Sequence, residues 1–179
     1  AHTLRLTAEQ SYNVAKKKDM ASADFNSDGL VDMKSEYTFA HAYYAASFDK
    51  GGKTNYLETI TKAFIHGREV IASANGRALN FDERNKLLGH RDIIVLNWEK
   101  VIAESVFKYA GSVYKDMNKL EEDASDKNFS NYAKHWGELK GFALALQCGK
   151  NNLGETAVKL NRMMGYGPVL MNASQVIGV

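Results

Sequence analysis

The chain contains a single proline, Pro168, in 179 residues. Proline removes a backbone donor and breaks helix interiors, so a chain almost free of it can form long helices. Apolar residues recur at spacings of three and four over long stretches, which is the pattern of helices with one buried face. The strands needed for a sheet are missing. We therefore predict an all-α protein, and its length suffices for a single helical-bundle domain over residues 1–179.

Capping signals and polar breaks divide the chain into expected helices. We place these helices near residues 8–19, 32–48, 55–72, 82–121, 130–147 and 155–164. Asn55 with Glu58 resembles a capping box, and Asn80 is predicted to cap the long helix that follows it. We expect Gly111 to kink or break that long helix.

The segment DFNSDGLVDMKSE, residues 24–36, has nearly the spacing of an EF-hand calcium loop. Calcium takes six to eight oxygen ligands, several of them from carboxylates, and Gly29 permits the sharp turn that such a loop needs. The expected ligands are side-chain oxygens, one backbone carbonyl and a closing carboxylate: Asp24, Asn26, Asp28, the Leu30 carbonyl, Asp32 and Glu36. Calcium is therefore the expected cofactor.

The closing glutamate of this loop is displaced by one residue. Ser35 occupies the twelfth position, where a bidentate glutamate is usual, and Glu36 follows it. If the exit helix begins at Asp32, Glu36 lies one turn later on the same face and closes the site with it. The shift rotates the glutamate by about 100° around the helix axis, so the closing geometry differs from that of a standard hand. The alternative is a solvated, Asx-rich turn that caps the next helix.

Two His-x-x-Glu pairs, His66/Glu69 and His135/Glu138, are the other candidate metal ligands. At this spacing an imidazole and a carboxylate share one face of a helix. Di-iron bundles use the reverse order, Glu-x-x-His, together with further inward glutamates. The alternative for each pair is a buried histidine that is hydrogen-bonded in the core.

Composition and motifs argue against several classes of function. A net charge of +2 is too small to indicate a nucleic-acid partner. No segment approaches the roughly 18 uninterrupted apolar residues of a membrane span. Cys148 is the only cysteine, so no internal disulfide is possible. Because the chain has no nucleophile elbow, P-loop or Rossmann fingerprint, we predict that it is not an enzyme.

Five sequence blocks, in order, carry a family resemblance: DFNSDGLVDMKSEYTFAHAYYA, FIHGREVI, NWEKVIAESVFKYAG, KHWGELKGFALALQ and LNRMMGYGPVL. They are similar to the imelysin-like family of exported bacterial proteins, which is related to iron-regulated protein A, and they cover nearly the whole chain. The family's Gly-x-His-x-x-Glu motif is not present literally, and the nearest match is KHWGE, with His135 and Glu138.

The resemblance implies a helical fold, export, and a role in iron or haem acquisition. It also implies that residues 1–179 are the C-terminal part of a larger imelysin-like domain. An upstream half of that domain, or another copy of the chain, would then be the partner that covers its apolar faces.

The preferred interpretation is an exported calcium-binding helical bundle with a binding or structural role. It would act in the periplasm, at the outer surface or in the extracellular space. Its calcium loop would fasten a helix junction, with an affinity of about 0.1–1 mM, typical of extracellular modules. Two alternatives stay open: an iron- or haem-handling protein, and a self-assembling surface or filament subunit.

Overall fold

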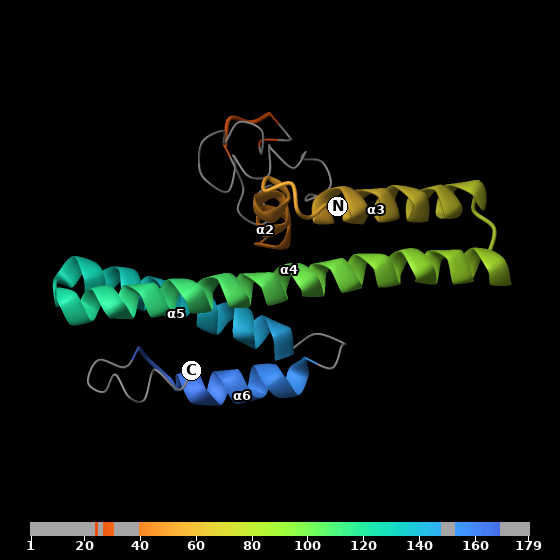
Figure 1. The fold of residues 1–179 in the computed structure, drawn as a ribbon. Coiled ribbons are helices and arrows are strands. Elements are labelled where there is room, and N and C mark those ends of the chain that lie inside the picture. Colours follow the sequence, from red (N-terminus) through yellow and green to blue (C-terminus); the bar gives the residue numbers. More distant parts are fainter. Residues whose placement is uncertain (1–23, 25–26, 31–39, 148–152, 169–179) are drawn as a thin grey trace. The chain divides into compact units, whose positions relative to one another are not determined.

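A computed structural model describes residues 24, 27–30, 40–147 and 153–168. These residues contain five helices and no strand, which confirms the all-α prediction (Figure 1). The helices are α2 Ala40–Asp49, α3 Tyr56–Ser73, α4 Phe81–Glu122, α5 Asp126–Gln147 and α6 Gly154–Met164. The helix predicted near residues 8–19 and the first part of the one predicted at 32–48 lie outside the described residues.

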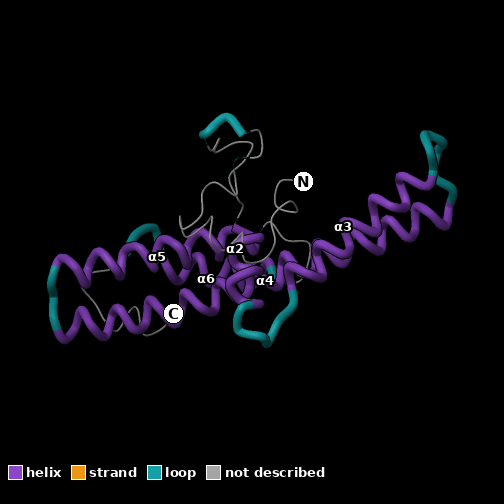
Figure 2. Tube along the Cα trace, turned by 90° about the horizontal axis from the view of Figure 1, so that it is seen from above, coloured by secondary structure: helices purple, strands orange, loops and turns teal. Residues whose placement is uncertain are grey.

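The chain divides into two compact units, residues 1–101 and 102–179, and the division falls inside α4. In its described part, the first unit holds α2, α3 and the beginning of α4. The second holds the rest of α4 with α5 and α6. Short loops join α3 to α4 and α4 to α5 (Figure 2). A single domain over the whole chain stays a prediction.

The core of the first unit forms where α2 and α4 contact α3. Ile60 and Ala63 of α3 are buried against Ile94 of α4, and half-buried aromatic residues surround this cluster. The rings of Phe64 and Trp98 lie 5.9 Å apart. The helix α2 packs against α3 and buries three alanines, Ala42, Ala45 and Ala46. Small side chains on this face allow α2 to lie close to its neighbours.

The beginning of α3 is capped by a side chain from the end of α2. Asp49 Oδ1 accepts a hydrogen bond from the Tyr56 amide at 2.8 Å, and Asp49 Oδ2 accepts one from the Leu57 amide at 2.8 Å. The Thr54 hydroxyl also donates to Asp49, at 2.8 Å. Asn55 makes no side-chain capping bond, so the capping box predicted there is wrong. A carboxylate at a helix N-terminus also interacts favourably with the helix dipole.

Replacing this cap tests how much the α2–α3 junction depends on it. Asp49→Ala should lower the free energy of unfolding by about 1–2 kcal/mol, because two helix amides lose their acceptor. Asn55→Ala should change it by less than about 0.5 kcal/mol, as expected for an exposed side chain with no capping role. Urea unfolding of both variants measures the difference. Equal losses in the two variants would contradict the assignment of the cap to Asp49.

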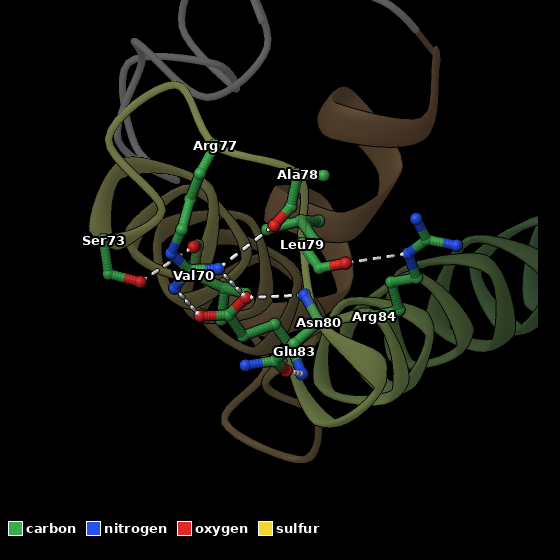
Figure 3. Close-up of polar contacts among 8 residues, drawn as sticks. All are labelled: Val70, Ser73, Arg77, Ala78, Leu79, Asn80, Glu83 and Arg84. Carbon is green, nitrogen blue, oxygen red and sulfur yellow. Dashed lines mark hydrogen bonds and ion pairs between the residues drawn. The ribbon is translucent and has the colours of Figure 1, made fainter.

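The turn between α3 and α4 holds a reciprocal capping box (Figure 3). Asn80 Oδ1 accepts from the Glu83 amide at 2.9 Å, and Glu83 Oε2 accepts from the Asn80 amide at 2.9 Å. The predicted cap at Asn80 is thereby confirmed. The Arg77 guanidinium pairs with both oxygens of Glu83, with 2.7 Å between Nη1 and Oε2. The hydrogen bond from Arg77, followed by that from the Asn80 amide, lowers the pKa of Glu83 to about 2.

The lowered pKa of Glu83 gives the turn a defined pH dependence. Because the folded-state pKa lies below the ordinary value of 4.5, ionised Glu83 stabilises the fold above pH 4.5. This contribution is lost as the pH falls from 4.5 towards about 2. The difference in unfolding free energy between the wild type and Glu83→Gln should therefore shrink over this range.

Urea titrations at a series of pH values measure that difference. Glu121→Gln, at the exposed end of α4, is the matched control and should keep a smaller and flatter difference from the wild type. A gap between the wild type and Glu83→Gln that stays constant down to pH 2 would refute the assignment.

The helix α4 runs without interruption from Phe81 to Glu122, so the predicted break at Gly111 is wrong. Gly111 is exposed, and a Cβ added there would meet no atom within 4 Å. One glycine costs a helix about 1 kcal/mol. Tyr109 and Val113, on either side of Gly111, are buried within the second unit, and their packing offsets that cost.

In the second unit, α5 packs on α6 and faces the C-terminal part of α4. The buried side chains of α5 are Tyr132, Leu139 and Ala143. Lys140 Nζ donates to the backbone carbonyls of Asn161 at 2.7 Å and of Gly165 at 2.9 Å. It thus places a positive charge at the end of α6, where the helix dipole favours one. None of the described helices has the length and apolar character to cross a membrane.

Candidate functional site

The structure describes five positions of the predicted calcium loop, residues 24 and 27–30. The Asp24 carboxylate accepts hydrogen bonds from the Asp28 amide at 3.2 Å and from the Gly29 amide at 3.0 Å. Asp28 Oδ1 accepts a further bond from the Leu30 amide at 2.8 Å. These bonds fold the loop back onto its first carboxylate. The other predicted ligands, Asn26, Asp32 and Glu36, lie outside the described residues.

Two of the described loop residues adopt left-handed backbone conformations. Ser27 has φ of 60° and Gly29 has φ of 85°. Glycine reaches this region without a steric cost, whereas serine does so less readily. The sharp turn predicted at Gly29 is confirmed. These two left-handed residues bring the Leu30 amide close to the Asp28 carboxylate. The Leu30 side chain itself is 73% exposed.

The carboxylates of the loop can each take more than one contact. An ionised carboxylate offers about four lone-pair sites, and the Asp24 carboxylate accepts two described amides. Asp24 is half-buried, whereas Asp28 is exposed. The loop therefore presents carboxylate oxygens within a single turn, as a calcium loop does. An Asx-rich turn shares the same hydrogen bonds, so the two interpretations differ only in whether an ion is bound.

His135 on α5 pairs with Asp116 on α4 through its Nδ1 atom. Asp116 is buried, whereas the His135 side chain is 28% exposed. The ring of Tyr109 lies 5.9 Å from that of His135, and Tyr109 stacks on Phe142 at 5.6 Å. This arrangement fits the alternative in which His135 is a hydrogen-bonded core histidine. It leaves only Nε2 available for a metal, because Nδ1 contacts the carboxylate.

Neither His-x-x-Glu pair forms a compact ligand set in the described part of the chain. Glu138 Oε2 is buried and has no hydrogen-bond partner among the described residues. His66 and Glu69 are exposed, and the His66 ring lies 5.7 Å from that of His90 on α4. No three histidine, cysteine, aspartate or glutamate side chains gather there as a metal site. An ion at either pair would therefore need ligands from elsewhere.

Sequence reasoning missed two partners in these sites, Asp116 and His90. Asp116 continues the buried stripe of Tyr109 and Val113 at helical spacing, and an acidic residue in such a stripe is a signal that a partner faces it. His90 gives no comparable signal, because its neighbour His66 belongs to another helix.

No family model, no curated protein and no solved structure matches this chain.

Removing His135 should show how much free energy it costs to bury the Asp116 carboxylate without a partner. We expect His135→Ala to lower the free energy of unfolding by about 3 kcal/mol, because Asp116 is left buried without its partner. His66→Ala, which removes an exposed histidine, should cost less than about 0.5 kcal/mol. Denaturant unfolding of both variants is the measurement. The double variant Asp116→Asn/His135→Ala is compared with the two single variants. If its loss of unfolding free energy equals the sum of the two single losses, the two residues are not coupled.

Proposed function

We propose that this chain is a calcium-stabilised helical domain of an exported bacterial protein, with a binding or structural role at the envelope or cell surface. One observation carries the proposal: Asp24 accepts the amides of Asp28 and Gly29, so the loop curls around its first carboxylate. The regular spacing of acidic and amide side chains then supplies the oxygen ligands that calcium prefers.

The proposed closure of the site uses Asp32 and Glu36. At a spacing of four residues, these carboxylates lie one turn apart on the face of a helix that begins at Asp32. The Leu30 carbonyl supplies the backbone ligand expected at the seventh position. This arrangement accounts for the displaced glutamate without a defect in the loop.

The packing of α2 favours a fastening role over a sensing role. The described part of this helix starts at Ala40, four residues after Glu36, and Ala45 and Ala46 within it are fully buried. Calcium sensors respond by moving helices apart and exposing a groove. A helix packed this closely is better suited to being held in place, so the ion would fix the segment that enters it.

Export is part of the same proposal and rests on the imelysin-like resemblance. Extracellular calcium modules bind at about 0.1–1 mM, which matches a loop whose closing glutamate is displaced. The periplasm, the outer surface and the extracellular space all fit this requirement.

A thermal melt with and without calcium tests the proposal. At about 10 mM calcium, a site of this affinity should stabilise the fold by about 1.4–2.7 kcal/mol. For a chain of this size, that corresponds to a rise in melting temperature of about 3–10 °C. A chelator should reverse the rise, and magnesium should give a smaller one.

Two variants decide whether the loop is responsible. Asp24→Ala with Asp28→Ala should abolish the calcium-dependent rise. Asp82→Asn, an exposed acid in the first turn of α4, should keep it. A melting temperature that does not respond to millimolar calcium rejects the calcium proposal, and an unchanged response in the loop variant rejects the site.

A second candidate is an iron- or haem-handling protein, which the contact between His66 and His90 favours. The ring centres of these two imidazoles, from neighbouring helices, lie 5.7 Å apart. They are close enough to coordinate the same metal ion. Elemental analysis and a visible spectrum of the natively purified protein separate the two candidates. Calcium alone supports the first candidate, whereas iron or a Soret band supports the second.

A further inference from the structure

An apolar groove lies between α3 and α4 in the first unit, with a volume of about 360 Å³. Its apolar lining comes from both helices: Phe64, Ile71, Leu87, Ile94, Val95 and Trp98. Small-molecule sites have volumes of roughly 300–1,000 Å³ and are lined mainly by apolar side chains with a few polar groups. The groove therefore has the size and lining of a site for a small ligand.

Gly67 and the aromatic residues give the groove its shape. A Cβ added to Gly67 would lie 3.4 Å from Leu87 Cδ1, which is a van der Waals contact, so α3 and α4 lie close together there. Phe64 and Trp98 are only half-buried, although their rings contact each other. Flat apolar surface thus faces the groove without being fully covered by described residues.

The charged residues of the lining are both arginines, Arg68 from α3 and Arg91 from α4. Arg91 pairs with its exposed neighbour Asp92 at 2.6 Å, and this carboxylate does not line the groove. Arg68 has no ion pair with another described residue. His90 also lines the groove, and its buried Nδ1 atom has no hydrogen-bond partner in the described part of the chain.

We propose that this groove binds a small amphipathic carboxylate, with an aliphatic chain against the apolar lining and the carboxylate at Arg68 and Arg91. Arginine forms strong, often bidentate, hydrogen bonds with carboxylates. A neutral apolar ligand would leave the two guanidinium groups without a new partner. A cationic ligand would face two like charges, because no acidic side chain among the described residues lines the groove.

Trp98 provides a direct reporter of binding. The chain has two tryptophans, so Trp136→Phe leaves Trp98 as the sole source of tryptophan fluorescence. Titration with decanoate, below its micelle concentration, should change this fluorescence saturably. Decanol, with the same chain and no charge, should bind at least about tenfold more weakly. Methyl NMR shifts of Ile71 and Val95 in the unmodified chain provide a second readout that does not depend on the substitution.

Arginine variants test whether the charge is recognised. Arg68→Ala with Arg91→Ala should weaken decanoate binding at least about tenfold and leave decanol binding unchanged. Arg84→Ala is the matched control, because Arg84 lies on α4 but does not line the groove. Its affinity for decanoate should equal that of the parent chain.

Three results overturn the proposal. One is the absence of saturable change in both fluorescence and methyl shifts. Another is equal affinity for decanoate and decanol, unaffected by the arginine substitutions. The third is a chain that light scattering shows to be dimeric and that does not respond to decanoate, since a second copy then occupies the groove.

Discussion

The hydrogen bonds from backbone amides to the Asp49 carboxylate are the interaction on which the described part of the first unit depends most. A helix leaves its first amides without intrahelical partners, and α3 satisfies two of them with this side chain from the end of α2. The bonds fix where α2 ends relative to the beginning of α3. That position allows Ala45 and Ala46 to be buried.

The same kind of bond recurs in two other turns of the described chain. Asp24 accepts two amides in the loop at residues 24–30, and Glu83 accepts the Asn80 amide before α4. Arg77 adds a charge to the second case and lowers the pKa of Glu83. Side-chain acceptors thus organise turns that have few apolar contacts of their own. In the first loop, a bound cation would reinforce an arrangement that the amides already favour.

Local patterns predicted the helices well because helical periodicity and short polar breaks are properties of neighbouring residues. They failed where the deciding partner is distant. The cap of α3 comes from Asp49, on the other side of a glycine turn. The spacing of Asn55 and Glu58 therefore predicted a capping box that does not form. Gly111 did not break α4, because packing on both sides outweighs its low helix propensity. In the candidate sites, the Asx-rich turn was predictable, whereas the partner of His135 required knowledge of how α4 and α5 face each other.

We propose that calcium in the loop at residues 24–36 holds the entrance to α2. Amide hydrogen exchange measures this most directly, because exchange reports the local opening of each helix. Calcium at about 10 mM should slow exchange of the α2 amides by about tenfold or more, while exchange of the α5 and α6 amides should be unchanged. Identical exchange of α2 with calcium and with a chelator would contradict it.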